Sequence, residues 1–322
     1  MKRIVVVGGN GFFGRLITER LRAAGLEPLV ASRSSTELRI DANSAEDLRA
    51  QLKQRDLVID AAGPFQTRTP ALIEAAAKIG FDVIDINDTP GYAAMVYEHE
   101  APIAAAGIRV LTSCSTLSTV SAAVLGMSSV GHPRRLTAYL RPASRRTANP
   151  ASVNSFLGSL IGRPRILRFP QPLGSRRGVT VRTADSIMLP RLFPSLREAE
   201  LIVDAGVPGA NAILRAAVNR PQVRRLLDRY RDAAVALVRR IGPRSGILAY
   251  EIVTTGGQKH QFFTGEQTHL TAVIPAVMAA QSIAAGRFPH RGVVPPSQHL
   301  DAAALFEALW REGIAVVPPW GT

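Results

Sequence analysis

Residues 3–14 read RIVVVGGNGFFG, and this stretch decides the fold. Its first half, Arg3 to Val7, has the β-branched apolar composition of a short buried strand. Its second half is a G-x-G-x-x-G motif that follows the strand at once and opens a helix predicted over residues 12–24. A strand, a glycine turn and a helix in this order are typical of the first half of a βαβ unit that binds a dinucleotide.

Each glycine of the motif has a physical task. Gly9 permits the tight turn, Gly11 lets the backbone approach a pyrophosphate, and Gly14 lets the helix pack closely on the strand. The N–H groups and the dipole at the helix N-terminus favour negative charge. The alternative is a glycine turn with a purely structural role. We predict a dinucleotide site whose turn consists of Gly9, Asn10, Gly11, Phe12, Phe13 and Gly14.

The end of the second predicted strand, residues 28–32, bears on which nucleotide binds. A site selective for NAD places an acidic residue there, whereas this chain has Ser32-Arg33-Ser34. A guanidinium pairs with a 2′-phosphate, and the flanking hydroxyls can donate hydrogen bonds to it. We therefore predict that NADP(H) is preferred over NAD(H), the alternative being that Arg33 is an ordinary solvated arginine. Asp41 either lies by the adenine or is a plain loop carboxylate.

Strands and helices continue to alternate as far as residue 112. Strands are predicted over residues 57–61, 82–86 and 108–112, and helices over 44–54, 70–78 and from Pro90 on, with Pro102 kinking or dividing the last one. Such alternation predicts a doubly wound parallel sheet covered on both faces. The segment Ala61-Ala62-Gly63-Pro64-Phe65 would then run beside the cofactor, unless it is a simple strand-ending turn.

Length and composition are those of a globular protein. The chain has 322 residues, of which 46% are hydrophobic and 20% are charged, and this excludes a fibre or a disordered chain. The longest apolar runs are too short to span a membrane. Cys114 is the only cysteine, which excludes an internal disulfide and a Cys-cluster metal site. We expect a cytoplasmic protein without a bound metal.

The basic charge is concentrated in the middle of the chain. Residues 134–244 contain 22 arginines, no lysine and six acidic residues, a net charge of +16, whereas the whole chain has +14. This change in composition predicts a domain boundary near residues 120–130. In the middle domain, strands are predicted over 136–140, 179–182, 199–204, 247–254 and 258–264. They indicate a mostly antiparallel sheet flanked by helices, one face of which could form a homodimer.

Apolar residues at helical spacing, interrupted by Pro221, run from Asn211 to Ile241 with arginines on the opposite face. A solvated basic face is the favoured interpretation. Nucleic acid is disfavoured because no aromatic interleaving or nucleic-acid motif accompanies the arginines, and peripheral membrane contact is considered but not favoured. Small anionic substrates are a further option, with the candidate arginines Arg141, Arg145, Arg146 and Arg182.

Three segments resemble the saccharopine dehydrogenase-like NAD(P)-dependent oxidoreductases: residues 8–14, residues 60–65 and the run from Ala75 to Ile86. The C-terminal residues 292–296, 305–309 and 313–316 are similar to the closing segment of that family. The resemblance implies a Rossmann domain, residues 1–120, completed by residues 286–322, and a second α/β domain for substrate and dimerisation, residues 121–285. It also implies hydride transfer between a nicotinamide cofactor and a C=N or C=C centre.

The chain departs from that family in two places. Its middle part is short and dense in arginine, and Val83-Ile84-Asp85 stands where the family usually has Tyr-x-Asp. The identity of the substrate is therefore not carried over.

Candidates for proton transfer lie where open α/β sheets bind ligands, at the carboxyl ends of the strands. Asp88 follows one strand and Cys114 the next, although Asp88 could cap a helix and Cys114 could be a buried core residue. His269 matches a region in which the family's second domain faces the cofactor, but it could be structural. The sequence thus predicts an oxidoreductase acting on a small anionic substrate. The alternative is a non-enzymatic NADP(H)-binding sensor or interaction protein.

Overall fold

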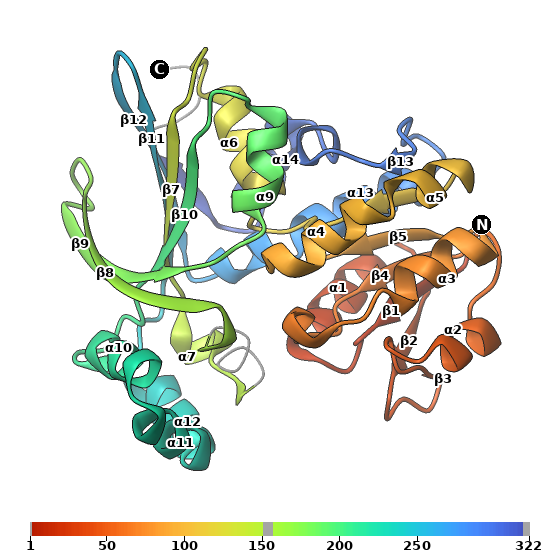
Figure 1. Cartoon of the computed structure of the whole chain (residues 1–322), viewed down its shortest axis with the longest axis horizontal. Coiled ribbons are helices and arrows are strands. Elements are labelled where there is room, and N and C mark those ends of the chain that lie inside the picture. The colour runs from red at the N-terminus through yellow and green to blue at the C-terminus, as the bar shows by residue number, and fades with distance from the viewer. Residues whose placement is uncertain (1, 151–156, 318–322) are drawn as a thin grey trace. The chain divides into compact units, whose positions relative to one another are not determined.

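The computed structural model describes residues 2–150 and 157–317, which form two compact units (Figure 1). The first unit extends to Ala123 and includes Thr271–Leu305. The second comprises Val124–Leu270 and the chain from Phe306 on. The change of unit at Ala123 falls close to the predicted boundary near residues 120–130.

The first unit is built on a seven-stranded, all-parallel sheet with the strand order β13-β6-β5-β4-β1-β2-β3. Every residue of β1, β4 and β5 is buried, because helices cover both faces of a parallel sheet. This confirms the doubly wound parallel sheet predicted from the sequence. The strands are β1 (Ile4–Val7), β2 (Pro28–Ser32), β3 (Leu38–Arg39), β4 (Leu57–Asp60), β5 (Asp82–Asp85), β6 (Arg109–Leu111) and β13 (Gly292–Val293).

The helices of this unit follow the predicted spacing with small differences at their ends. The predicted division of the helix that begins at Pro90 is confirmed, with the break at His99. Pro102 has no N–H to donate to the Glu98 carbonyl, and its ring would clash with that carbonyl, so the first helix ends at Glu98 and Pro102 lies in the first turn of the next. The helices are α1 (Phe12–Ala23), α2 (Ala45–Gln51), η1 (Phe65–Thr67), α3 (Ala71–Ile79), α4 (Pro90–Glu98), α5 (Glu100–Ala105), α13 (Ile274–Ala284) and η3 (Pro296–Gln298), and α6 (Thr119–Met127) begins here.

A segment distant in sequence completes the first unit. Helix α13 contacts α1, β4 and β5, and most of its residues are buried. Strand β13 pairs with β6, Gly292 opposite Arg109 and Val293 opposite Val110. Further along the chain, His299 hydrogen-bonds to Thr119. The C-terminal segment therefore extends the parallel sheet, as the family resemblance implied.

The second unit contains a seven-stranded mixed sheet with the order β14-β12-β11-β7-β10-β9-β8. All neighbouring pairs are antiparallel except β10 and β7, which confirms the predicted mostly antiparallel sheet. Aromatic and aliphatic side chains, among them Tyr139, Phe169 and Phe262, form a core cluster of this unit. The strands are β7 (Arg135–Arg141), β8 (Leu160–Arg168), β9 (Ser175–Val181), β10 (Glu198–Val203), β11 (Gly246–Thr254), β12 (Gly257–Gly265) and β14 (Ala315–Val317).

Two elements of the second unit differ from the sequence interpretation. Strand β8 was not predicted, because Gly162 and Pro164 interrupt its pattern, and the pairing with β9 shifts register there. Strand β14 pairs with β12, so residues 315–317 join the second sheet. The limits 1–120 plus 286–322 and 121–285 stay a prediction about domains, and residues 318–322 lie outside the described part.

The remaining helices are α7 (Ser144–Thr147), α9 (Asp185–Leu192), α10 (Ala210–Asn219), α11 (Pro221–Arg229), α12 (Arg231–Ile241), η2 (Thr268–Ala272) and α14 (Ala302–Arg311). Within the described residues, no helix is both long and apolar enough to cross a membrane.

Candidate nucleotide-binding site

The glycine turn between β1 and α1 is packed so closely that side chains are excluded. A Cβ on Gly14 would lie 2.1 Å from the carbonyl oxygen of Gly8, and a Cβ on Gly9 would lie 2.9 Å from a methyl group of Val30. Gly8 has φ +78°, and its Cβ would lie 2.7 Å from the backbone of Ala62. Gly8 was missing from the predicted site. The signal that could have found it is the glycine pair directly after the strand.

The N-terminus of α1 is arranged to accept an anion. Gly11 caps the helix without a side-chain hydrogen bond, and the first turn contains no acidic residue. The Gly11 N–H donates to the Gly8 carbonyl over 2.8 Å, which closes the turn. A helix end with neither a side-chain cap nor a carboxylate leaves its positive dipole end for a bound phosphate. The motif therefore has the geometry that its sequence predicted.

The predicted residues after β2 lie next to this turn. The Asn10 side-chain amide donates to Ser32 Oγ over 2.9 Å, and the Ser34 N–H donates to the same oxygen over 3.2 Å. Arg33 and Ser34 are exposed. The ends of β1 and β2 are thus joined through Ser32, and Arg33 follows it with its guanidinium in solvent.

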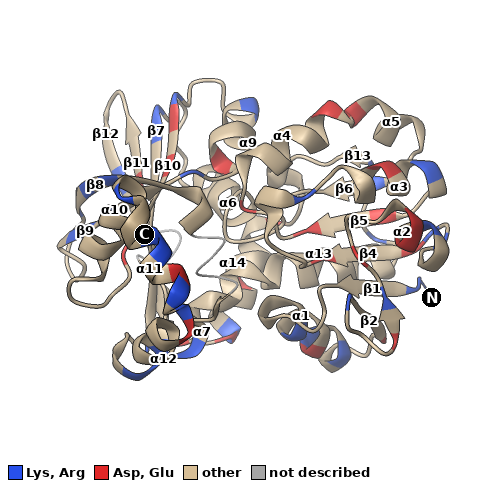
Figure 2. Ribbon diagram, turned by 60° about the horizontal axis from the view of Figure 1, so that its bottom comes forward, with Lys and Arg blue, Asp and Glu red and all other residues tan. Residues whose placement is uncertain are grey.

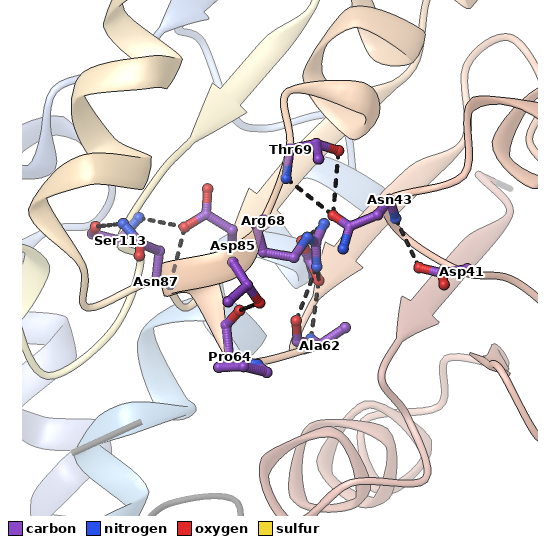
Figure 3. A network of polar contacts seen from close by, with 11 residues as sticks. Asp41, Asn43, Ala62, Pro64, Arg68, Thr69, Asp85, Asn87 and Ser113 are labelled. Carbon is purple, nitrogen blue, oxygen red and sulfur yellow. Dashed lines mark hydrogen bonds and ion pairs between the residues drawn. The ribbon is translucent and has the colours of Figure 1, made fainter. Parts of the chain in front are cut away.

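Asp41 has an evident structural task. Its Oδ1 accepts the N–H of Asn43 over 2.9 Å, and its own N–H donates to Asp47 Oδ2 over 2.9 Å. Asn43 in turn accepts from the backbone and the hydroxyl of Thr69, as Figure 3 shows. These bonds order the turn before α2. They support the interpretation of Asp41 as a loop carboxylate, while its proposed place by the adenine stays a prediction.

An ion pair fixes the backbone that follows β4. Arg68 Nη2 lies 2.7 Å from Asp60 Oδ2, and these side chains are 3% and 0% exposed. Asp60 Oδ1 accepts the Ala62 N–H over 2.9 Å. Arg68 Nη1 donates to the Ala62 carbonyl over 2.9 Å, as Figure 3 shows. Both polar groups of Ala62 are therefore held by one buried pair. The same Ala62 backbone lies against Gly8.

Aromatic rings surround this pair. The Arg68 guanidinium lies over the rings of Phe65 and Tyr92, with its carbon 5.6 and 5.9 Å from their centroids. Phe65 and Tyr92 also contact each other edge to face, at 5.1 Å. The sequence analysis included Phe65 but missed Arg68 and Tyr92. A signal was available, because Asp60 is a carboxylate in an otherwise apolar buried strand and requires a partner.

The ends of β5 and β6 form a second polar network. Asp85 Oδ1 accepts the N–H groups of Ser113 and Asn87 over 2.8 and 3.0 Å, and the Asn87 amide donates to Ser113 Oγ over 3.2 Å (Figure 3). Burial raises the pKa of Asp85 to about 7. These bonds join two neighbouring strand ends at the edge of the sheet where ligands of such folds bind.

The three catalytic candidates differ in placement. Asp88 is half-buried, and desolvation raises the pKa of its carboxyl to about 6. Cys114 is fully buried, and burial raises the pKa of its thiol, so the thiol stays protonated at neutral pH. His269 lies in η2 and belongs to the second unit, whereas Asp88 and Cys114 belong to the first. Of the three, Asp88 is best suited to proton transfer near neutral pH.

The predicted cofactor residues come together at one edge of the parallel sheet. The turn of residues 9–14, Ser32 and the segment 61–65 follow β1, β2 and β4, and the contacts of Gly8 and Asn10 join them. Asp41 lies one strand further along, after β3. Among the described residues, no cluster of three or more His, Cys, Asp or Glu side chains could hold a metal ion.

Comparison with known proteins assigns this part of the chain. A parallel α/β sheet with a glycine turn at the carboxyl ends of its strands is typical of dinucleotide-binding domains, and the family match supports that assignment. Residues 4–111 match the family model described as the saccharopine dehydrogenase NADP binding domain. The resemblance predicted from the sequence is confirmed for this region. A search of curated proteins finds no match.

Three solved structures show a partial likeness at low identity. The UDP-N-acetylglucosamine 4-epimerase of Bacillus cereus is 19% identical, with a TM-score of 0.29, over 35% of this chain and 60% of that chain. The amine dehydrogenase of Mycobacterium smegmatis is 10% identical, with a TM-score of 0.46, over 92% and 96%. GenD2 from gentamicin A biosynthesis, in complex with NAD, is 14% identical, with a TM-score of 0.45, over 98% and 96%. The chain thus spans less than two thirds of the epimerase, and none of these likenesses informs its function.

Proposed function

We propose that this protein is an NADP(H)-dependent oxidoreductase that transfers a hydride to or from a C=N or C=C centre of a small anionic substrate. The observation that carries the preference for NADP(H) is the end of β2. Ser32, joined to the glycine turn through Asn10, is followed by an exposed arginine and no carboxylate. An arginine at this place can pair with a 2′-phosphate, whereas an NAD site requires an acidic residue for the ribose hydroxyls.

In this reaction, different residues of the chain bind the cofactor, supply the proton and attract the substrate. The nicotinamide, when bound, supplies or accepts the hydride. The glycine turn and the N-terminus of α1 hold the pyrophosphate, and the Asp60–Arg68 pair keeps the Ala62 backbone in place beside the turn. The protonated carboxyl of Asp88 donates its proton to the second atom of the reduced double bond, the nitrogen of C=N or the other carbon of C=C. The basic charge of residues 134–244 favours an anionic substrate.

A binding measurement tests the nucleotide preference. Calorimetry on the wild type should show tighter binding of NADPH than of NADH. Arg33→Asp should remove that preference by weakening NADPH about 10- to 100-fold, since an arginine–phosphate pair is worth about 1.5–3 kcal/mol. The matched control is Arg287→Asp, an exposed arginine in the first unit, which should leave both affinities unchanged. Equal affinity of the wild type for NADPH and NADH would contradict the proposal that Arg33 pairs with the 2′-phosphate.

Turnover separates the enzyme from a nucleotide-binding sensor. We expect NADPH absorbance to be consumed with at least one member of a panel of anionic imines, enones and ketones. Because the pKa of Asp88 is raised to about 6, the protonated carboxyl is depleted above that pH, and the rate of reduction should fall about tenfold for each further pH unit. Asp88→Asn should remove this fall and lower the maximal rate about 10²-fold or more, whereas Asp301→Asn should do neither. No turnover with any compound, with intact NADPH binding, would favour the sensor.

A further inference from the structure

Helices α10, α11 and α12 expose large apolar side chains. Six of the eight exposed large hydrophobic residues in the described part of the chain lie on these helices or at their caps: Ile213, Val218, Leu226, Tyr230, Leu237 and Ile241. Leu226, Tyr230 and Leu237 are 57%, 53% and 55% exposed, and α11 has no buried residue. The sequence pattern had indicated an amphipathic helical segment with arginines on one face. In the structure much of its apolar side also faces solvent.

The same helices are strongly basic. Residues 210–241 contain eight arginines and two aspartates, a net charge of +6, with no lysine or glutamate. Figure 2 shows the basic segments along α11 and α12. Arg215, Arg220, Arg225 and Arg240 are exposed, and Arg229 lies over the ring of Tyr230 at 5.5 Å. Exposed arginines and exposed apolar side chains therefore occur on the same three helices.

The spacing gathers the exposed apolar side chains within each helix. Leu226 and Tyr230 are four residues apart, as are Leu237 and Ile241, so each pair lies on one face of the helical path. Long arginine side chains next to such a face can extend to phosphate groups while their stems cover apolar surface. This combination is typical of helices that lie in the plane of a membrane interface.

Charge and apolar exposure favour one of three partners for the surface of α10–α12. A second copy of the chain would place two surfaces of net charge +6 against each other, which like-charge repulsion disfavours. Nucleic acid would use the arginines but would leave Leu226, Leu237 and Ile241 without a partner on a phosphate backbone. An anionic bilayer offers phosphate for the arginines and acyl chains for the apolar side chains.

We propose that α10–α12 form a membrane-docking surface that binds bilayers rich in anionic phospholipid. Arg215, Arg220, Arg225 and Arg240 contact the headgroups, and Leu226, Tyr230, Leu237 and Ile241 enter the interface. This inference does not depend on the proposed oxidoreductase activity.

Vesicle sedimentation with the full-length protein tests the surface. At low salt we expect binding to vesicles of equimolar phosphatidylcholine and phosphatidylglycerol, and little binding to phosphatidylcholine alone. Raising the salt should weaken binding because headgroup attraction is screened. Absence of binding to the anionic vesicles would overturn the proposal.

Two double substitutions separate the charge from the apolar contribution. Arg215→Glu with Arg225→Glu should weaken binding at least about tenfold, since each basic residue near an anionic surface contributes about fivefold. Leu226→Ser with Leu237→Ser should also weaken it about tenfold or more, because leucine insertion is lost. The charge-matched control is Arg49→Glu with Arg287→Glu, in the first unit, and the apolar control is Ile166→Ser with Trp310→Ser. NADPH binding, measured on every variant, reports whether the fold is intact.

A fluorescent label reports insertion directly. Cys114 is the only cysteine and is buried, so Leu237→Cys can be labelled selectively with an environment-sensitive dye. The dye should shift to the blue on anionic vesicles, whereas the same dye on Ala45→Cys, exposed in the first unit, should not. Equal spectra at the two positions would overturn the proposal.

Other occupants give distinct results. Binding of duplex DNA at an affinity that Leu226→Ser with Leu237→Ser leaves unchanged, together with weaker binding to vesicles than to DNA, would assign the surface to nucleic acid. A dimer in solution that the same double substitution dissociates would assign it to a second copy. Either outcome would overturn the proposal.

Discussion

Gly14 and Gly91 show how differently two helical glycines are constrained. A Cβ on Gly14 would lie 2.1 Å from the Gly8 carbonyl oxygen and 2.7 Å from the Gly9 Cα. The atoms it meets are backbone and cannot rotate away, so α1 itself would have to move. Gly91, in the first turn of α4, has no atom within 4 Å of the position a Cβ would take.

Gly14→Ala should therefore destabilise the protein by about 2–4 kcal/mol, as overpacking and helix displacement do, and should abolish NADPH binding. Gly91→Ala should leave stability unchanged or raise it by up to about 1 kcal/mol, because alanine is the better helix former. Urea unfolding and calorimetry with NADPH measure both effects. Unchanged NADPH affinity in folded Gly14→Ala would contradict the role given to the close approach.

The roles of Gly9, Gly11 and Gly14 could be predicted from the sequence because they depend on local backbone geometry and on spacing along one strand, turn and helix. Gly8 and Arg68 depend on contacts made only when β4 pairs with β1. Those contacts, Gly8 with Ala62 and Arg68 with Asp60, follow from sheet order. Sequence spacing alone does not supply them.

The connection between β4 and α3 is held by a single buried ion pair. Arg68 bonds both to Asp60 and to the Ala62 carbonyl, and its guanidinium is enclosed by Phe65 and Tyr92. Loss of one partner leaves the other charge buried and uncompensated, which costs more than loss of both.

Arg68→Met should thus lower the free energy of unfolding by about 3–5 kcal/mol, and the double variant with Asp60→Asn should recover part of that loss. The matched control is Arg311→Met, whose ion pair with Glu307 on α14 is exposed and should contribute less than about 0.5 kcal/mol. Urea unfolding of the single and double variants gives the coupling. Additive losses would show that the pair does not act as a unit.

Helices and strands were predicted correctly where the spacing of apolar residues fitted only one type of secondary structure. The strands and helices of residues 4–111 alternate with glycine and proline at their ends, and their limits were found to within a few residues. The spacing over residues 211–241 predicted helices too, and α10, α11 and α12 are present. Their exposure could not be predicted, because an apolar stripe is buried only if another element packs against it.

The first unit is closed by a side chain far along the chain. His299 Nδ1 lies 2.8 Å from Thr119 Oγ1, and Nε2 lies 3.0 Å from the Val294 carbonyl oxygen. A carbonyl only accepts, so Nε2 carries the proton and Nδ1 accepts from the Thr119 hydroxyl. Through these two hydrogen bonds, the neutral ring joins the segment that contains β13 to the start of α6. Resemblance to a family indicated that a C-terminal segment completes the sheet, but no sequence pattern identified His299 as its anchor.

Acid should therefore loosen this closure. Burial lowers the pKa of His299 to about 4, below the value of about 6.5 that an unfolded histidine has. Between pH 4 and pH 6.5 His299 binds a proton in the unfolded chain but not in the folded protein. The contribution of His299 to the free energy of unfolding is therefore fully present above about pH 6.5. It is lost as the pH falls towards 4, by at most about 3 kcal/mol. Urea unfolding at pH 7.5 and pH 4.5 measures the loss.

His299→Gln, which can keep one donor and one acceptor but does not titrate, should show a smaller difference between the two pH values. His290→Gln, in the same segment, should retain the wild-type difference, and an equal difference in wild type and His299→Gln would show that this ring does not govern the acid response.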